Sequence, residues 1–501
     1  MRWIHPLSPA SKAVVGGKAH GLALLRRLGL PVPAGFVIGT DACRAFLRDG
    51  RLPDGLDGEL AAAIADLEGA TDRRFGGPGR PLAVSVRSGA VESMPGMMTT
   101  VLNLGLTETA TAGLAAETGD ARFALDSRLR FLSSFAAATA GLSAATLEAT
   151  EQLEQAVVAV FSSWDTPRAK TYRDLHAIPH DLGTAVVVQA MVFGNRDDHS
   201  GSGVAFSRNP NTGEHTAYGE VLFGCQGEDV VSGRSLTRPL SDLADREPAV
   251  CADVLEALNR VEEHYRDACY LEFTYEAGDL WLLQVRPGRF VGAAAVRLAT
   301  DLADEGLIGR HEALLRVSPE HLRHVHIRRL ARVDEADLFA RGLGACPGVA
   351  VGRLATTADK AARMAAEGPV ILVRPETSPL DMHGIAAAAG VVTARGGPAS
   401  HAAVVARAMG KPAVVGIANL TVAGASVQAG GRTITEGALI ALDGTSGEVV
   451  IGSPRITTTA NDPYLHRLLE WADDVSGDAA ERTEPERLRA AHDALHLRPQ
   501  R

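Results

Sequence analysis

Apolar runs separated by turn residues divide the 501-residue chain into the short strands and helices of an α/β protein. Runs at 36–38, 84–87 and 390–393 have the length of buried strands, and 183–195 contains a longer aliphatic run. A helix is predicted over 401–409, because Gly410 and a proline two residues later stop it. We therefore expect a multi-domain α/β fold.

The remaining pattern adds a hairpin and three helical regions. Residues 271–290 read as two strands around a turn at Ala277 and Gly278. An Ala-rich helical pattern covers about 107–180, and residues 291–340 are helical and charged. After about 454 the pattern predicts a helical or disordered tail.

Composition excludes several function classes. The net charge of -10 argues against nucleic-acid binding, which needs a basic surface. No apolar run approaches the length of a membrane span, and the N-terminus lacks the apolar segment of a signal peptide. Five scattered cysteines without a CxxC pair suit a reducing compartment and provide no zinc site. We expect a cytoplasmic protein that binds neither nucleic acid nor membrane.

The most informative stretch is 391–416, with one histidine at its centre. A Gly-Gly-Pro turn precedes Ser400, which can cap the helix, and His401 stands in the first helical turn. Free backbone N–H groups and the positive end of the helix dipole would favour a phosphate on the imidazole. Arg395 and Arg407 are the nearby cations. The alternative is a histidine that only helps to cap a helix.

Two basic residues in the N-terminal third are candidates to bind phosphate. Lys18 follows two glycines at a helix start, so backbone N–H groups and one ammonium can meet an anion. Arg87 ends a predicted strand beside the methionine-flanked turn at 93–98, which we expect to be mobile. The alternatives are a surface lysine and a structural ion pair.

The predicted hairpin supplies a possible cation site. Glu272 and Gln284 lie on its two strands and can converge on one cation, for which Mg²⁺ prefers oxygen ligands of this kind. Arg286 is two residues on, points to the same side as Gln284 and can reach a phosphate. The alternative is a set of outward polar residues on an amphipathic hairpin.

These motifs carry a resemblance. TARGG-x-x-SHAAVVARAMGKP resembles the phosphohistidine motif of the phosphoenolpyruvate-utilising enzymes, most closely that of the pyruvate phosphate dikinase family. GGKAHGLALLRRLGLPVPAGFVI and SVRSGA-x-x-SMPGMM-x-TVLNLGL resemble parts of that family's nucleotide domain. The resemblance covers residues 10 to about 475. It implies an ATP-grasp domain followed by a swivelling phosphohistidine domain.

The resemblance also implies domain boundaries. It places the ATP-grasp domain at 1–290 with its helical insert at about 107–180, a helical linker at 291–340, the swivelling domain at 341–453 and a tail at 454–501. The tail resembles the start of the connector to the family's third domain, a barrel that binds pyruvate or phosphoenolpyruvate. We expect a truncated form without that barrel.

Site roles follow from the resemblance residue by residue. It implies His401 as phosphohistidine carrier, Lys18, Arg87 and Arg286 at the ATP phosphates, Glu272 and Gln284 as Mg²⁺ ligands, Gln189, Met191 and Val192 beside the base, and Glu228 with Asp229 facing metal or ribose. Core packing is the alternative for Met191 and Val192, and a solvated loop carboxylate is the alternative for Glu228.

The implied activity is half of the dikinase reaction. ATP and inorganic phosphate would give AMP, pyrophosphate and phospho-His401, with Mg²⁺ as cofactor. The phosphoryl group would pass to pyruvate, or to another acceptor, bound by a separate chain; a homodimer is a further option. Whether phosphate or water takes the γ-phosphoryl group stays open.

Three departures from the family pattern keep alternatives open. Thr99 and Tyr270 stand where dikinases have aspartate, and Ala399 replaces a threonine that some dikinases use for regulation. The loss of two carboxylates allows a degenerate nucleotide-binding regulatory phosphocarrier. An antibiotic phosphotransferase of the rifampicin type is a third option, although 291–340 is short for its acceptor domain.

Overall fold

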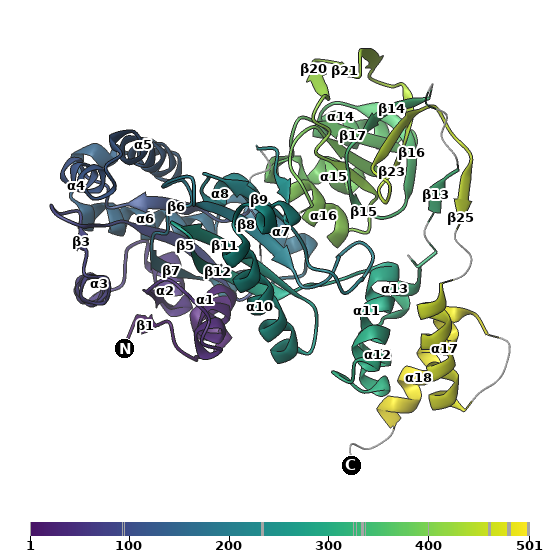
Figure 1. Ribbon diagram of the computed structural model, residues 1–501, viewed down its shortest axis with the longest axis horizontal. Helices are drawn as coiled ribbons and strands as arrows, with labels where there is room; N and C mark the ends of the chain where they lie inside the picture. The colour runs from purple at the N-terminus through teal and green to yellow at the C-terminus, as the bar shows by residue number, and fades with distance from the viewer. Residues whose placement is uncertain are drawn as a thin grey trace. The chain divides into compact units, whose positions relative to one another are not determined.

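The computed structural model describes residues 2–497 except 93, 95, 232–234, 324, 327, 332–334, 336, 399, 459–461 and 478–481 (Figure 1). The chain divides into two compact units that interleave along the sequence. Unit 1 comprises Met1–Ser202, Phe223–Gln226 and Glu272–Val285, and unit 2 comprises Gly203–Leu222, Gly227–Leu271 and Arg286–Arg501. Both contain helices and strands, which confirms the predicted α/β class.

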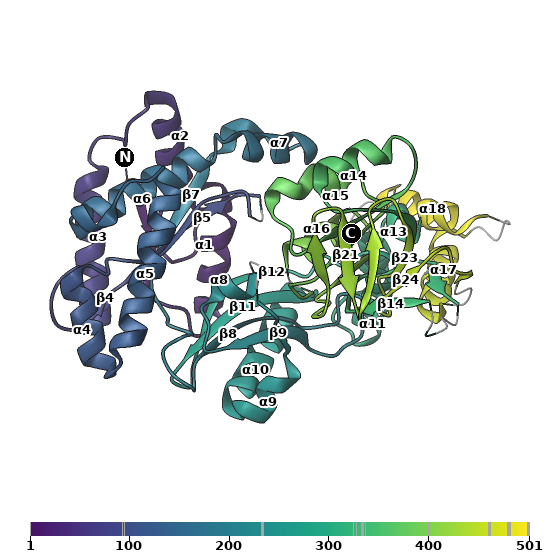
Figure 2. The same ribbon diagram turned by 90° about the horizontal axis from the view of Figure 1, so that it is seen from above.

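Unit 1 contains a five-stranded sheet in the order β1-β2-β7-β5-β6. Helix α1 packs on one face, and α5 and α6 pack on the other (Figure 2). Because both faces are covered, the aliphatic run of β7 is buried throughout. The strands are β1 (Ile4–Pro6), β2 (Gly35–Ile38), β5 (Val84–Ala90), β6 (Thr100–Leu104) and β7 (Thr184–Ala190).

The predicted helical insert is present in unit 1. Its helices bury Phe131, Phe135 and Phe161 in one core with the sheet. The capping is local: Thr107 accepts a hydrogen bond from the Ala110 amide at the start of α4. The helices of unit 1 are α1 (Lys12–Arg27), α2 (Thr40–Asp49), α3 (Leu56–Thr71), α4 (Glu108–Thr118), α5 (Ala121–Ala138), α6 (Ala149–Ser163) and α7 (Pro167–Leu175), with 3₁₀ turns η1 (Ala144–Thr146) and η2 (His180–Leu182) and a two-stranded ribbon β3 (Arg74–Phe75) and β4 (Pro81–Leu82).

Helix α1 contains a break near its start. Helical residues begin at Lys12, and Gly16 interrupts them with φ 75° and ψ 168°. A Cβ atom at Gly16 would lie 1.5 Å from the Gly89 carbonyl oxygen. Glycine is therefore required here by both the backbone conformation and the close approach to β5.

A second sheet has the order β10-β9-β8-β11-β12. Its last two strands form the predicted hairpin, with Ala277 and Gly278 both at positive φ in the turn. Residues 227–231 form a short helix. The elements are β8 (Gly201–Phe206), β9 (Tyr218–Phe223), α8 (Gly227–Val231), β10 (Arg238–Pro239), α9 (Ser241–Arg246), α10 (Pro248–Tyr265), β11 (Cys269–Glu276) and β12 (Asp279–Pro287).

Unit 2 contains an eight-stranded sheet in the order β14-β24-β23-β16-β17-β18-β19-β15. Strands β16 to β19 run parallel, and α16 packs on β15, β18 and β19. The predicted strand and helix of the central motif are β18 and α16. The elements are β14 (Leu338–Arg341), β15 (Leu343–Cys346), β16 (Val349–Ala355), α14 (Ala358–Ala365), β17 (Val370–Arg374), η3 (Pro379–Asp381), α15 (Met382–Ala387), β18 (Gly390–Thr393), α16 (His401–Ala408), β19 (Ala413–Val415), β23 (Leu439–Asp443) and β24 (Glu448–Ile451), with a three-stranded sheet of β20 (Thr421–Ala423), β21 (Ser426–Ala429) and β22 (Arg432–Thr435).

Helices that precede the strands of this sheet in the sequence pack against helices that follow them, within unit 2. The last two helices contact α11, α12 and α13, and strand β13 pairs with β25 (Figure 1). Among the described residues of 291–340, the last helix ends at Arg323. The elements are α11 (Gly292–Asp304), α12 (Arg310–Arg316), α13 (Pro319–Arg323), β13 (Arg328–Leu330), β25 (Ile456–Thr458), α17 (Pro463–Ser476) and α18 (Glu484–Leu497). The predicted domain boundaries stay a prediction. Among the described residues, every helix is too short or too polar to cross a bilayer.

Candidate functional site

Lys18, Arg87 and Glu272 form an electrostatic cluster in unit 1. Burial, and to a smaller extent the charge of Arg87, lower the pKa of Lys18 to about 7 against the opposing charge of Glu272. Arg87 is 8% exposed, and burial lowers its pKa while Glu272 again opposes the shift. Two cations held together with one carboxylate and partly removed from water provide positive charge for a polyphosphate.

Arg87 does not end its strand, as the apolar run suggested, because β5 continues to Ala90. Its Nη2 atom donates a hydrogen bond to Gln189 Oε1 on the neighbouring strand β7. The Gln189 side chain is 1% exposed, and its Nε2 atom donates to the Pro33 carbonyl oxygen at 3.1 Å. The contacts of Gln189 therefore fix Arg87. The placement of Gln189 beside a nucleotide base stays a prediction.

The other residues predicted near the base follow the end of β7. Met191 and Val192 are partly buried, and Met191 packs against the core of unit 1. The expectation that the methionine-flanked turn is not core-like is wrong for Met94 and Met97, which are 6% and 2% exposed. The mobility of this turn stays a prediction. Ser93 and Pro95 lie outside the described residues.

Glu272 and Gln284 lie on the neighbouring strands β11 and β12. Both side chains are partly exposed. A carboxylate and an amide carbonyl are hard oxygen donors, so this pair fits Mg²⁺ better than a softer metal.

Tyr270 and Arg286 contact each other in unit 2. The guanidinium of Arg286 lies 4.0 Å from the centroid of the Tyr270 ring. Tyr270 is 2% exposed, and its ring packs edge-on against Phe206 at 4.9 Å between centroids. A buried aromatic ring thus occupies the position at which the family pattern has aspartate.

Glu228 lies on the short helix α8 in unit 2, with its side chain exposed. Its predicted role at metal or ribose stays a prediction.

His401 is the first residue of α16, as its sequence context predicts. Its Nδ1 atom lies 3.1 Å from the Thr377 hydroxyl oxygen, and its buried Nε2 atom has no hydrogen-bond partner. Burial lowers the pKa of the ring to about 4, against the opposing charge of Asp381. The imidazole is therefore neutral at pH 7, with one nitrogen engaged and the other unpaired.

The loop that carries Thr377 is held by Asp381. This carboxylate is 6% exposed and accepts hydrogen bonds from the Ser378 amide at 2.8 Å and hydroxyl at 3.1 Å. Arg374 Nε lies 3.2 Å from its other oxygen. The sequence reading missed Thr377 and Asp381. Their position beside His401 depends on the pairing of the parallel strands β17 and β18, whose carboxyl ends meet at one edge of the sheet.

The two arginines near His401 have structural contacts. Arg407 is 9% exposed, donates to the Ala345 carbonyl oxygen at 2.9 Å and donates to that of Pro398. It therefore fixes the turn before His401. Arg395 lies 3.2 Å from Glu376 at the surface. Ala399 lies outside the described residues.

Ser400 occupies the predicted N-cap position, but its hydroxyl makes no capping hydrogen bond. The residue is 3% exposed, and its Oγ atom has no hydrogen-bond partner.

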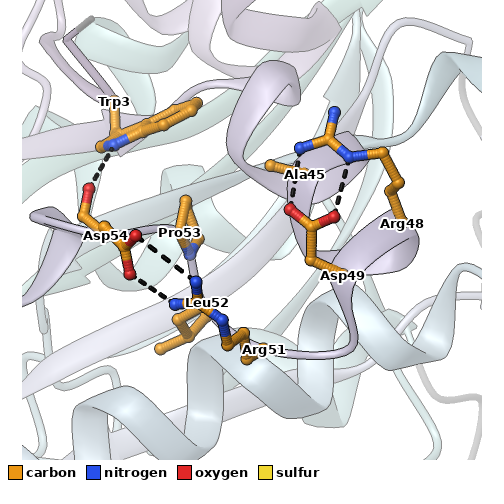
Figure 3. Close-up of a pocket in the computed structure, with 8 residues that line it drawn as sticks. All are labelled: Trp3, Ala45, Arg48, Asp49, Arg51, Leu52, Pro53 and Asp54. Carbon is orange, nitrogen blue, oxygen red and sulfur yellow. Dashed lines mark hydrogen bonds and ion pairs between the residues drawn. The ribbon is translucent and has the colours of Figure 1, made fainter.

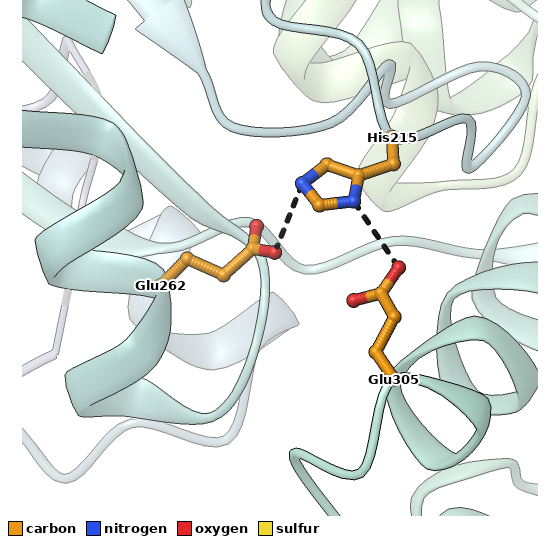
Figure 4. A group of neighbouring side chains, drawn as sticks. All are labelled: His215, Glu262 and Glu305. Atoms are coloured by element: carbon orange, nitrogen blue, oxygen red, sulfur yellow. Dashed lines mark hydrogen bonds and ion pairs between the residues drawn. The ribbon is translucent and has the colours of Figure 1, made fainter. Parts of the chain in front are cut away.

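A second cluster of titratable side chains lies in unit 2, where His215, Glu262 and Glu305 converge (Figure 4). The His215 nitrogens face different carboxylates, Nδ1 at 3.1 Å from Glu305 and Nε2 at 3.7 Å from Glu262. The fully buried Arg208 lies 2.6 Å from Glu262 and 2.5 Å from Glu305. Because a guanidinium already bridges the carboxylates, this group is an ion-pair network rather than a metal centre.

A surface pocket of about 210 Å³ in unit 1 is lined by Trp3, Ala45, Arg48, Asp49 and residues 51–54 (Figure 3). Its charged side chains pair with one another, Arg48 with Asp49 and Arg51 with Asp54. None of its lining residues belongs to the predicted site.

Two family models match the chain. The model for "Pyruvate phosphate dikinase, AMP/ATP-binding domain" matches residues 12–68 and 49–239. The model for "PEP-utilising enzyme, mobile domain" matches residues 366–447.

Similar curated proteins come from plants and bacteria. "Pyruvate, phosphate dikinase 2" of Zea mays is 41% identical over 516 residues, which are 93% of this chain and 58% of that protein. "Pyruvate, phosphate dikinase" of Rhizobium meliloti (strain 1021) is 41% identical over 523 residues, 92% of this chain and 58% of that protein. The chain therefore spans a little over half of the length of these relatives.

Proposed function

Because the chain belongs to the pyruvate phosphate dikinase family, we propose that it is an ATP-dependent phosphotransferase that phosphorylates its own His401. ATP and inorganic phosphate would give AMP, pyrophosphate and phospho-His401. A new bond forms between a ring nitrogen and the β-phosphorus, and the bond to the α-phosphate breaks as AMP leaves. Phosphate then takes the γ-phosphoryl group, which releases pyrophosphate and leaves the β-phosphoryl group on the ring.

The observation that carries this proposal is the state of the His401 ring. Thr377 engages Nδ1 at 3.1 Å, while Nε2 has no partner. With the proton on Nδ1 donated to the Thr377 oxygen, the lone pair is on Nε2. A pKa of about 4 keeps this nitrogen unprotonated at neutral pH, as an attacking nucleophile requires.

The unit 1 cluster supports the nucleotide half of the proposal. Lys18 and Arg87 would bind the phosphates of ATP, with Gln189 holding Arg87 in place. Arg286 would add a third cation. Neutralising and positioning the phosphates is the main task of a protein in phosphoryl transfer.

Glu272 and Gln284 would hold Mg²⁺, which would neutralise phosphate charge when bound. Met191 and Val192 would line the base, and Glu228 would face the metal or the ribose. These assignments follow the family resemblance and the hard oxygen donors of the hairpin.

We further propose that phospho-His401 donates to an acceptor bound by a separate chain, with pyruvate as the first candidate. The matched family domains are an AMP/ATP-binding domain and a mobile domain, and both belong to the donor half of the proposed reaction. A route through a separate chain predicts that this chain forms no phosphoenolpyruvate from ATP, phosphate and pyruvate alone.

The test is labelling with ATP carrying ³²P at the β-position. The wild-type chain should acquire acid-labile label in the presence of phosphate, and His401→Ala should acquire none. Label that persists in His401→Ala would remove the carrier role. Nucleotide binding without any label would instead favour the regulatory phosphocarrier. Tyr270 is one reason to keep this alternative, because a buried aromatic ring stands where the resemblance implies an acidic group.

A further inference from the structure

Ser400 has a buried hydroxyl with no use in the fold. The residue is 3% exposed, and its Oγ atom makes no hydrogen bond. It stands at the N-cap of α16, where a serine side chain ordinarily accepts a hydrogen bond from an amide of the first turn, yet that bond is not made. Buried polar groups in folded proteins are nearly always paired, so an unpaired one calls for an explanation.

The next residue repeats the pattern. His401 Nε2 is buried and has no partner, although Nδ1 of the same ring meets the Thr377 hydroxyl. A hydroxyl and a ring nitrogen on consecutive residues are therefore both unpaired at the start of an eight-residue helix. The first-turn amides of a helix also lack intrahelical partners, and the dipole is positive at this end.

A phosphoryl group on Nε2 would satisfy this set of groups. It has three acceptor oxygens, whereas water offers only one. The covalent bond uses the Nε2 lone pair, the amides of the first turn donate to phosphoryl oxygens, and a serine hydroxyl supplies one further donor. His401 as a residue is partly exposed, so a local movement of its side chain can make room for the group.

We propose that Ser400 is a phosphoryl-binding residue whose hydroxyl donates a hydrogen bond to the phosphoryl group carried on His401 Nε2. This role rests on the proposed function, in which His401 is phosphorylated. The bond holds the phosphohistidine against attack by water, so Ser400 lengthens the lifetime of the phosphorylated chain. Capping of α16 is not its role.

The experiment uses a donor that does not need the nucleotide site. Potassium phosphoramidate transfers its phosphoryl group to histidine: the P–N bond of the reagent breaks, an N–P bond forms at the ring, and ammonia leaves. Wild type, Ser400→Ala and Ser426→Ala are phosphorylated in this way, and the decay of phospho-His401 is followed by ³¹P nuclear magnetic resonance. Ser426 is the matched control, since its hydroxyl donates only to the Ala423 carbonyl oxygen at 2.9 Å, on a surface hairpin.

The expected result is a phosphohistidine half-life at least roughly tenfold shorter in Ser400→Ala than in wild type or Ser426→Ala, the size of one lost hydrogen bond to a charged group. The melting temperature of unphosphorylated Ser400→Ala should not fall, because the substitution removes an unpaired buried group. An unchanged half-life overturns the proposal. A lowered melting temperature of unphosphorylated Ser400→Ala also overturns it, because such a loss shows that the hydroxyl caps α16.

The same experiment separates this role from the proposed function. If phosphoramidate phosphorylates His401 with the expected Ser400 dependence while β-labelled ATP leaves no label, the proposed function fails and the role of Ser400 stands. If ATP labels His401 and the phosphohistidine half-life in Ser400→Ala is unchanged, the proposed function stands and the role of Ser400 fails. A wild-type chain that gains no phosphohistidine at position 401 from either donor overturns both.

Discussion

At the scale of single residues, burial and neighbouring charges set the protonation of Lys18. Burial and the nearby Arg87 bring its pKa to about 7, so near pH 7 about half of the molecules carry a neutral lysine. Burial and the charge of Arg87 destabilise the ammonium form of Lys18 in the free protein. Phosphates bound beside Lys18 would stabilise the ammonium form again.

Binding of Mg-ATP should therefore take up about half a proton near pH 7 and nearly one proton at pH 8.5. The sign follows from the lowered pKa of the free protein, and affinity should fall as pH rises above about 7. Calorimetry in buffers of different ionisation enthalpy measures the uptake. Lys18→Met should abolish it, whereas Lys12→Met should retain it, since Lys12 is exposed and lies 3.7 Å from Glu92. Equal uptake in Lys18→Met would contradict the assignment.

At the scale of elements, the break in α1 places its second part against β5. Gly16 and Gly50 both have positive φ, so alanine is strained at either site. They differ in their surroundings: a Cβ atom at Gly16 meets the Gly89 carbonyl oxygen at 1.5 Å, and nothing lies within 4 Å of one at Gly50. The contrast separates backbone strain from the loss of a close approach between elements.

Gly50→Ala should cost about 1 kcal/mol of stability, the usual price of strain alone. Gly16→Ala should cost at least about 3 kcal/mol, because α1 must also move away from β5. It should weaken nucleotide binding too, since Lys18 follows two residues later. Urea unfolding and nucleotide titration measure the two effects. Equal small losses would show that α1 tolerates displacement.

At the same scale, local sequence patterns predicted the secondary-structure elements better than they predicted which side chains contact one another. The hairpin, β18 and α16 follow from residues close in sequence. The contact of Arg87 with Gln189 joins residues 102 positions apart and depends on the β5–β7 register, in which Ser85 lies opposite Gln189. The contact of Thr377 with His401 likewise needs the pairing of β17 with β18. Strand register over such distances is set by the whole fold, so a short motif cannot specify it.

At the scale of the whole molecule, the candidate groups divide between the two units. Lys18, Arg87 and the Glu272–Gln284 pair belong to unit 1, whereas His401 belongs to unit 2 together with two of the proposed nucleotide-site residues, Arg286 and Glu228. Each set has its own supporting contacts within its unit, Gln189 for Arg87 and Thr377 for His401. If each unit prepares its part of the reaction independently, binding and phosphorylation can be lost separately.

His401→Ala should bind a nonhydrolysable Mg-ATP analogue within about twofold of wild type, because it removes nothing from unit 1. Lys18→Met should bind the analogue roughly 10- to 100-fold more weakly, the size of one lost charge-assisted hydrogen bond. Phosphoramidate should still phosphorylate His401 in Lys18→Met at the wild-type rate, since this donor bypasses unit 1. Calorimetry and ³¹P nuclear magnetic resonance measure the two properties on the same preparations. Weakening in His401→Ala as large as in Lys18→Met would show that the imidazole contributes to nucleotide binding as much as the Lys18 ammonium does, and the separation of binding from phosphorylation would then be wrong.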